Sequence, residues 1–412
     1  MSRQKGSPSA WSNLLGNVSS QLFSGLATLL LAIRLPTAEF GAFMALYGVA
    51  IAAAALSDFG STQYQVRELA RKRDLSTYMS WLRARVVWAS CATAVMGVVV
   101  SAAGGFGLSL SVSFLLCAQL LTYTIAVALM GAVSAIRGSA SAMWSLALGN
   151  AFFLGLCTMS AGSDGLTLAA AGATGSWLVT SCACWMLLRP VVFRVPTARL
   201  AGTWQGSGAF GLAALSSVTL YLDLPLVAAI AGLEEAAHLG AISRWTMPIA
   251  LLANASAAHL FPLMSRAPTN LDARRMRAEV RPMLGLGLTA AALLFLMAGT
   301  VVGILLGPDY QAAVPTLRLL TVAAVIGIEV PILAAYLQAR DLQVSTAKVL
   351  LVGSVLRLAV TAALATRLGA DAAALAALLG ALWVALALRH LAKGSESPTR
   401  IGPLSFPGDS RP

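Results

Sequence analysis

Long apolar runs separated by short turns constrain the fold of this chain more than any other feature of its sequence. The first two runs, 14–33 and 43–56, flank a short segment that contains Arg34 and Pro36. Because a helix of about 20 apolar residues crosses a bilayer, two apolar runs joined by a turn predict a transmembrane hairpin. This unit occupies 11–70, and most of the remaining chain repeats it.

The composition supports a membrane protein with many spans. Hydrophobic residues make up 58% of the chain, charged residues 11%, and the mean hydropathy is +0.79. Soluble proteins carry about 25% charged residues. The net charge of +12 would suggest nucleic acid as the partner of a soluble chain. Here Lys and Arg gather in a few loops, as they do on the cytoplasmic side of membrane proteins, so we expect no nucleic-acid partner.

Glycine, proline and charged residues divide the chain into about twelve predicted spans. They are 14–33, 43–56, 81–103, 108–132, 142–161, 166–188, 208–231, 237–261, 283–306, 312–337, 346–366 and 372–388. We expect an all-α integral membrane protein in which two parallel six-helix repeats surround a central cavity. The expected parts are a cytoplasmic N-terminus (1–11), two bundles (12–190 and 207–390), a cytoplasmic linker (191–206) and a disordered cytoplasmic tail (391–412).

The distribution of basic residues sets the predicted orientation. The loops after the second, sixth and eighth spans carry Arg67, Arg71, Lys72, Arg73, Arg189, Arg194, Arg199, Arg266, Arg274, Arg275, Arg277 and Arg281. The loops after the third, fifth and seventh spans carry either no charge or acidic residues, and only Arg34 and Arg367 are basic exceptions on that side. By the positive-inside rule, both termini of this multi-pass protein are cytoplasmic.

A weak internal repeat relates the two halves of the chain. Residues 40–43 (Phe-Gly-Ala-Phe) and 239–242 (Leu-Gly-Ala-Ile) each follow an acidic turn in a hairpin, about 200 residues apart. An even number of spans separates the two hairpins, so both halves have the same orientation. This favours parallel repeats about an axis along the membrane normal, an arrangement known among transporters.

The sequence offers little for redox, metal or nucleotide chemistry. Its five cysteines lie inside apolar runs without a CxxC pair, and its three histidines form no HExxH motif. No GxxxxGK[ST] loop is present, and the outer loops are too short to form a catalytic domain. We therefore expect no enzyme activity, metal site, cofactor or direct use of ATP.

The candidates for charges deep inside predicted spans are Asp223, Arg244, Glu329 and Arg357. A charge at mid-bilayer costs about 2.5 to 3.5 kcal/mol on insertion scales, so each needs a partner or a function. Asp223 and Arg244 are equally far from the turn of one hairpin, and Glu329 and Arg357 from the turn of another. One hypothesis is that each hairpin holds an ion pair that fixes helix packing.

A functional hypothesis is compatible with that pairing. Arg244 and Arg357 could present a guanidinium group to a diphosphate, which arginine binds in bidentate geometry. Asp223 or Glu329 would then restrain the empty cavity or bind a coupling cation. A pair closed in one state could also open to substrate in another.

Other polar positions support narrower expectations. Asn17 and Gln21 share one face of the first predicted helix, where they could bond another helix or contact substrate. Asp58 lies at the cytoplasmic end of the second span and is expected to anchor the helix end, with coupling or gating as the alternative. Pro225 and Pro331 each follow an intramembrane acid by two residues, and both predict kinks.

Several motifs in this chain also resemble one known family. Residues 34–35 (Arg-Leu), 39–41 (Glu-Phe-Gly), 57–60 (Ser-Asp-Phe-Gly) and 67–70 (Arg-Glu-Leu-Ala) are similar to the opening of the polysaccharide biosynthesis proteins. Later segments fit in order: 220–223, 239–244, 261–266, 307–310, 315–320 and 368–372. The family belongs to the multidrug/oligosaccharidyl-lipid/polysaccharide exporter superfamily. One departure is Arg357, where the family often has Asn or small polar residues.

The resemblance implies a flippase for O-antigen or exopolysaccharide repeat units in the bacterial inner membrane. Its substrate would be an undecaprenyl-diphosphate-linked oligosaccharide, moved to the outer leaflet by alternating access. Membrane lipid would surround it, and polysaccharide polymerase and chain-length proteins would be possible partners.

Three alternatives remain open at this point. A multidrug exporter of the same superfamily should have an acidic cavity, whereas this chain has a base for each intramembrane acid. A polysaccharide polymerase or ligase usually needs a large external loop. A lipid II flippase usually adds two further C-terminal helices, where this chain has a polar segment.

Overall fold

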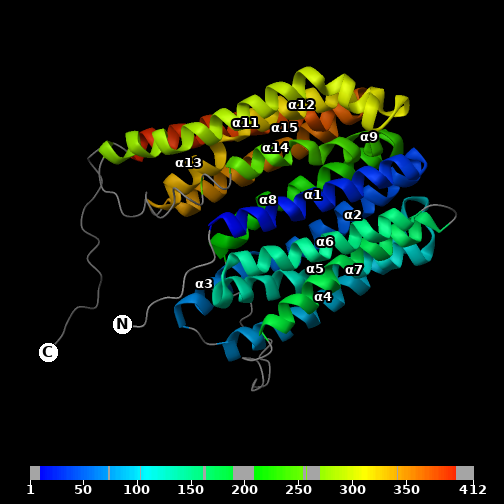
Figure 1. Cartoon of the computed structure of the whole chain (residues 1–412), viewed down its shortest axis with the longest axis horizontal. Coiled ribbons are helices and arrows are strands. Elements are labelled where there is room, and N and C mark those ends of the chain that lie inside the picture. The colour runs from blue at the N-terminus through cyan, green and yellow to red at the C-terminus, as the bar shows by residue number, and fades with distance from the viewer. Residues whose placement is uncertain are drawn as a thin grey trace.

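The computed structural model is a bundle of long helices (Figure 1). It describes residues 10–72, 75–102, 104–160, 164–188, 208–253, 257, 270–340 and 342–395. Within these ranges the regular secondary structure is entirely helical, and 11 helices are long and apolar enough to cross a membrane. The all-α, multi-span fold expected from the sequence is confirmed.

The described residues of the first half of the chain, 10–188, form seven helices and one 3₁₀ turn. They are α1 (Ala10–Arg34), α2 (Thr37–Asp58), α3 (Ser61–Lys72), α4 (Leu75–Ala102), η1 (Gly104–Gly107), α5 (Leu110–Arg137), α6 (Ser139–Met159) and α7 (Gly165–Leu188). The acidic turn expected before 40–43 is instead part of the first turn of α2, which begins at Thr37 and contains Glu39. The basic segment after α2 forms the amphipathic helix α3, which the apolar pattern did not predict.

The second half, 208–395, contains shorter helices as well as long ones. They are α8 (Gly208–Ala231), α9 (Leu233–Ser243), η3 (Arg244–Thr246), α11 (Asn270–Leu305), η4 (Pro308–Ala313), α12 (Val314–Gly327), α13 (Glu329–Gln338), α14 (Gln343–Leu368) and α15 (Ala370–Ser395). The expected linker and most of the expected tail lie outside the described residues.

The bundle has two ends, which we name by the course of α1. The near end is where α1 begins and α15 finishes, and the far end is where α1 ends and α2 begins (Figure 1). Hairpin connections 34–37, 231–233 and 368–370 all lie at the far end. Because successive long helices alternate in direction, depth in the bundle can be counted from the far end at 1.5 Å per residue.

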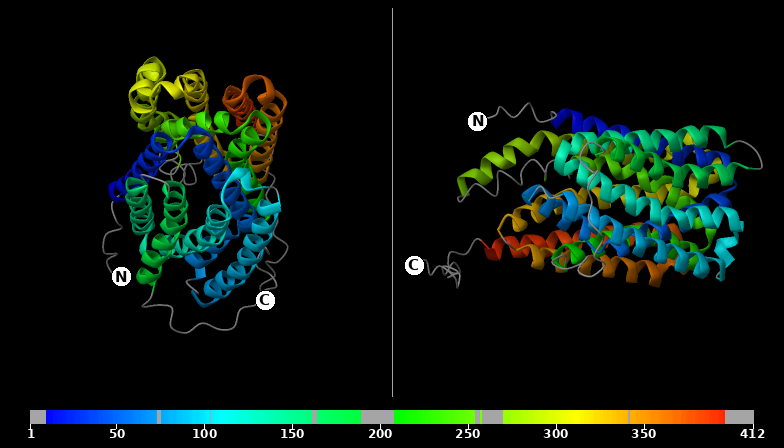
Figure 2. Two further views of the ribbon diagram at one scale, coloured as in Figure 1. Left: turned by 90° about the vertical axis from the view of Figure 1, so that its right-hand side faces the viewer. Right: turned by 90° about the horizontal axis from the view of Figure 1, so that it is seen from below.

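Each half packs mainly against itself. In the first half, α6 packs against α1 and α7, and α5 packs against α2, α4 and α7; in the second, α14 packs against α8 and α15, and α12 against α11 and α15. The two halves meet where α2 packs against α8 and α9. The view along the bundle shows the two groups of helices with these elements between them (Figure 2).

Glycines allow the two halves to approach closely. A Cβ atom at Gly41 of α2 would lie 1.9 Å from the carbonyl oxygen of Leu233 on α9, and one at Gly48 would lie 2.7 Å from that of Tyr221 on α8. On the other side of the contact, Gly240 of α9 lies against Met44 of α2. The repeated motifs at 40–43 and 239–242 therefore both lie in the contact between α2 and α9.

Proline explains two interruptions of the expected spans. The span at 237–261 begins as α9 and passes through the 3₁₀ turn η3 at Arg244, where the N–H of Met247 donates to the Arg244 carbonyl. Pro248 follows and cannot donate to that carbonyl, so the α-helical ladder is broken there. Likewise, α12 ends at Gly327, four residues before Pro331. The helix α8 continues through Pro225.

Candidate functional site

Four polar residues from both halves lie at one depth in the bundle. Ser24 and Tyr47 lie ten residues from the far ends of α1 and α2, Tyr221 ten residues from the far end of α8, and Arg244 eleven residues past the start of α9. At 1.5 Å per residue these positions are about 15 Å from the far end, half of a hydrocarbon core of about 30 Å. We call Ser24, Tyr47, Tyr221 and Arg244 the midplane cluster.

Arg244 joins the two halves within this cluster. One guanidinium nitrogen, Nη1, donates a hydrogen bond to the hydroxyl of Ser24, and the guanidinium carbon lies 5.7 Å from the centre of the Tyr47 ring. Among the residues that the structure describes, no carboxylate forms an ion pair with Arg244. Its charge is therefore held by a neutral hydroxyl and an aromatic face, which leaves donors for a ligand.

Tyr47 is one of several aromatic side chains in this part of the bundle. Tyr221 lies within electrostatic range of Arg244 and Tyr47, and Tyr123 of α5 within range of both tyrosines. Trp177 of α7 meets Tyr123 edge to face, with ring centres 4.7 Å apart. Phenol groups combine an apolar ring with a hydrogen-bonding hydroxyl. Such a surface can stack against a sugar ring and donate hydrogen bonds to its substituents.

The predicted positions Asn17 and Gln21 lie on the same face of α1 as Ser24. Residues 17, 21, 24 and 28 are spaced by four, three and four residues, which places them in one stripe along a helix. Ser24 bonds Arg244, so this stripe turns toward the second half. Asn17 and Gln21 are partly exposed and lie between the midplane cluster and the near end.

The expected pairing of Asp223 with Arg244 is wrong. Asp223 of α8 forms its ion pair with Arg357 of α14, and its side chain is only 5% exposed. Both helices belong to the second half and pack along each other. Equal depth in a hairpin limits how far apart two residues lie, but the rotation of each helix decides which neighbour a side chain faces. Arg357 is thereby held by an acid, and Arg244 is not.

The expected pairing of Glu329 with Arg357 is also wrong. Glu329 begins α13 and accepts hydrogen bonds from Nε and Nη2 of Arg389, on α15, at 2.9 and 2.6 Å. The side chains of Glu329 and Arg389 are 46% and 51% exposed. This pair therefore lies at the surface of the bundle and away from the midplane cluster.

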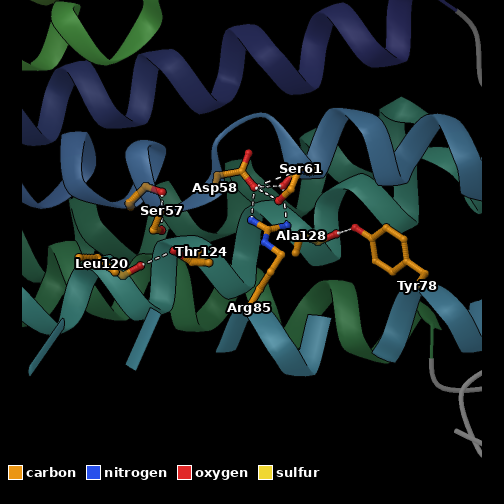
Figure 3. Close-up of polar contacts among 10 residues, drawn as sticks. Ser57, Asp58, Ser61, Tyr78, Arg85, Leu120, Thr124 and Ala128 are labelled. Carbon is orange, nitrogen blue, oxygen red and sulfur yellow. Dashed lines mark hydrogen bonds and ion pairs between the residues drawn. The ribbon is translucent and has the colours of Figure 1, made fainter. Parts of the chain in front are cut away.

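Asp58 is part of a buried network at the junction of α2, α3 and α4 (Figure 3). It forms an ion pair with Arg85 of α4, whose side chain is 2% exposed, and accepts a 2.7 Å hydrogen bond from the Thr62 hydroxyl. Its carboxylate also accepts from the Thr62 backbone N–H and the Ser61 hydroxyl, as a helix N-cap does. The carboxylate thus fixes the start of α3 to α4.

The chain between α2 and α3 is tightly turned at this network. Phe59 and Gly60 have φ angles of 41° and 67°, in the left-handed region. The Phe59 ring lies against Gly211 of α8, where an added Cβ would come within 2.4 Å of it. The Asp58 network therefore lies beside a contact between the two halves.

Several site residues escaped sequence reasoning. Ser24 completes a polar stripe with Asn17 and Gln21 at helical spacing, a signal that was available in the sequence. Arg85 lies in an apolar run and could have been sought as a partner for Asp58. Tyr47 and Tyr221 carried no signal, because single tyrosines are common in membrane helices at many positions.

Known structures share this arrangement of helices. No family model matches the sequence, and no curated protein matches it. An inward-facing multidrug resistance MATE family transporter of the MOP superfamily aligns with a TM-score of 0.69 and 16% identity, over 94% of this chain and 98% of that one. The lipid II flippase MurJ, in an inward closed conformation, aligns with a TM-score of 0.77 and 10% identity, over 92% and 87%. This chain has the same fold as these MATE and MurJ structures.

A third similar structure is that of a MOP-superfamily transporter from Pyrococcus furiosus. It aligns with a TM-score of 0.62 and 14% identity over 94% of each chain, and the reverse polarity of its binding pocket suggests a different function for it. At these identities the likeness concerns the fold alone. It is a two-repeat fold of 11 to 12 membrane-length helices, and the similar structures include a multidrug resistance transporter and a lipid II flippase.

Proposed function

We propose that this protein is a flippase that moves an undecaprenyl-diphosphate-linked oligosaccharide across the bacterial inner membrane for surface polysaccharide synthesis. The observation that carries the proposal is the state of Arg244. It lies at the level of the bilayer midplane, between the two halves, and its described contacts are a hydroxyl and an aromatic ring. The MOP fold adds support, because it is shared with a flippase of a lipid-linked substrate.

The charges around the midplane favour an anionic substrate. Asp223, the carboxylate closest to this level, already pairs with Arg357, and Asp58 at the near end pairs with Arg85. A cationic drug would gain most from an unpaired carboxylate, whereas a diphosphate would gain most from an unpaired arginine. Arg244 is therefore the proposed diphosphate ligand, and the tyrosines around it are proposed to contact the sugar.

Arg357, Asn17 and Gln21 have secondary parts in this proposal. Asn17 and Gln21 would meet the sugar on its way from the near end to Arg244, because they line the same face of α1. Arg357 would contribute directly only if its pair with Asp223 opened. The proposed role of Asp223 is to neutralise Arg357, and the proposed role of Asp58 is to anchor α3.

The proposed mechanism is alternating access between two bundles, 12–190 and 207–390. At the far end, α1 and η4 are joined by a 3.1 Å hydrogen bond from the Tyr310 hydroxyl to the Ala32 carbonyl. If both termini are cytoplasmic, this far end is the outer one, and the bond would hold the two halves together there. The sugar and diphosphate would enter from the cytoplasmic side while the lipid tail stays in the hydrocarbon.

The membrane potential can assist this direction of transport. Moving a negative charge outward against an inside-negative potential is favourable by about 2.3 kcal/mol per charge per 100 mV. A diphosphate therefore does not require a coupling ion, although an ion could take part. Polysaccharide polymerase and chain-length proteins are proposed as partners that take up the flipped lipid.

Purified protein in liposomes tests the proposal. A fluorescent diphosphate-linked oligosaccharide lipid should move between leaflets at least about tenfold faster than in empty liposomes, and the Arg244→Gln variant should lose that rate. An amphipathic cation serves as the competing substrate. Transport of the cation without transport of the lipid would establish a drug exporter and overturn the proposal.

A further inference from the structure

A groove with a volume of about 550 Å³ lies between α4 and α5 in the first half of the chain. Its α4 wall includes Ser90, Gly97 and Ser101, and its α5 wall includes Ser113 and Phe114. Both walls lie toward the far end, because α4 finishes there and α5 begins there. The groove is therefore separate from the midplane cluster, which is formed by α1, α2, α8 and η3.

The apolar rim shows that the groove opens to the lipid side of the bundle. Val98, Leu110 and Phe114 line it, and they are 70%, 71% and 68% exposed. Large apolar side chains with that exposure in a membrane-spanning helix face hydrocarbon. An occupant would therefore enter sideways from the bilayer.

The length of the groove corresponds to one leaflet. From Ser101 to Ser90 along α4 is 11 residues, which is about 16 Å at 1.5 Å per residue. Half of a hydrocarbon core of about 30 Å is nearly the same depth. A single chain from the leaflet at the far end would fill the groove from the interface to the middle of the membrane.

The hydroxyls of Thr93 and Ser113 in the wall both lack a hydrogen-bond partner among the described residues, and that of Ser113 points to the kind of lipid. Ser113 is 3% exposed, and its hydroxyl has no hydrogen-bond partner among the described residues. It is the fourth residue of α5, so it lies just below the far-end interface. An unpaired hydroxyl in hydrocarbon is costly, and a rotation about χ1 is enough to turn a serine donor toward a ligand. A carbonyl acceptor at this depth would satisfy it.

We propose that the groove binds a glycerophospholipid of the leaflet at the far end. One acyl chain lies along Ser101, Gly97 and Ser90, and its ester carbonyl accepts the hydrogen bond of Ser113. A polyprenyl diphosphate does not fit the same chemistry, because it has no carbonyl below its phosphates and its chain is longer than one leaflet. The bound lipid is thus a resident of the first half and not the transported molecule.

Photo-crosslinking tests the proposal on the full chain in nanodiscs. The probe is a phosphatidylethanolamine with a diazirine in the middle of one acyl chain, and labelled peptides are mapped by mass spectrometry. We expect labelling to concentrate on α4 and α5. In the Gly97→Leu variant, which fills the groove from a position with open space around its Cβ, labelling there should fall at least about fivefold.

Two further variants serve as a control and as a second test of the groove. Gly299 of α11 also has open space around its Cβ and is remote from the groove in the chain, so Gly299→Leu should leave the labelling unchanged. Ser113→Ala should weaken labelling about fivefold, the equivalent of a hydrogen bond of about 1 kcal/mol. Even labelling over all lipid-facing helices, no change in Gly97→Leu, or displacement by undecaprenyl phosphate but not by unlabelled phospholipid would overturn the proposal.

Discussion

Asp223 forms its ion pair with Arg357, across the contact of α8 and α14, and leaves Arg244 without an acidic partner among the described residues. The two pairs expected within hairpins would have neutralised all four charges locally. In the observed arrangement, Asp223 pairs with an arginine of its own half, and Arg244 donates to Ser24 of the first half. This difference turns Arg244 from a packing residue into a candidate ligand.

The Asp223–Arg357 pair should behave as a structural unit. Neutralising one partner, as in Asp223→Leu or Arg357→Met, leaves a buried charge and should cost about 3 to 5 kcal/mol of stability. The double variant Asp223→Leu/Arg357→Met should recover most of that loss, since apolar replacements of buried pairs are often neutral. Thermal unfolding of the four purified proteins gives the coupling energy. Additive losses in the double variant would contradict a direct pair.

The Asp58–Arg85 pair should likewise act on the structure of the first half. Asp58→Ala removes the carboxylate that caps the first turn of α3 from the end of α2 and leaves Arg85 buried and unpaired, which should cost about 3 kcal/mol or more. Conservative Asp58→Asn keeps part of the cap and should cost less. If the anchoring role is correct, variants that still fold transport at a rate within about threefold of the parent. A stable Asp58→Asn protein without transport would instead support coupling or gating.

The close contact between α2 and α9 should tolerate no side chain at Gly41. The Cβ of Gly41→Ala would meet the Leu233 carbonyl at 1.9 Å, so the helices must separate. Overpacking of this kind costs about 1 to 3 kcal/mol. Gly25 of α1 has open space, so Gly25→Ala is the control, and it should stabilise α1 by about 0.5 to 1 kcal/mol. Equal melting temperatures for the two variants would show that the contact is looser than described.

Closure of the far end should depend on Tyr310. Tyr310→Phe removes the hydrogen bond to the Ala32 carbonyl and should shift the equilibrium toward an open far end by about 1 kcal/mol, or about fivefold. A cysteine at Thr28, a buried residue on the same face of α1 as Ser24, reports the opening in a background without native cysteines. Its reaction with an impermeant thiol reagent added at the far end should rise about fivefold. An unchanged rate would place the closure elsewhere.

The helical fold was predictable because its signal is spread over hundreds of residues. Apolar runs placed nearly every long helix, and span 208–231 coincides with α8. The failures are local. The polar, basic composition of α3 gave no apolar run, so the search for apolar runs did not predict this helix. Pro248 interrupts the eighth predicted span, whereas α8 continues through Pro225, so the presence of a proline alone does not predict an interruption.

The site was less predictable than the fold, for a geometric reason. Sequence spacing predicted similar depths for Asp223 and Arg244, and the helix bounds put Arg244 about 15 Å from the far end. Sequence spacing did not fix the rotation of each helix, which decides the partner of a side chain. Arg357 and Asp223 come from helices separated by more than 100 residues, so no local pattern could pair them.

The most direct test of the account is the leaflet distribution of lipid-linked oligosaccharide in cells, measured by labelling the outward-facing sugar. Parent cells, cells without this gene, and cells with Arg244→Gln or Arg244→Lys at matched expression are compared. We predict that gene loss and Arg244→Gln trap the lipid on the cytoplasmic side, and that Arg244→Lys, which keeps the charge but not the bidentate fork, gives an intermediate value. Normal outward labelling in the absence of the gene, or in a stably expressed Arg244→Gln variant, would contradict the account.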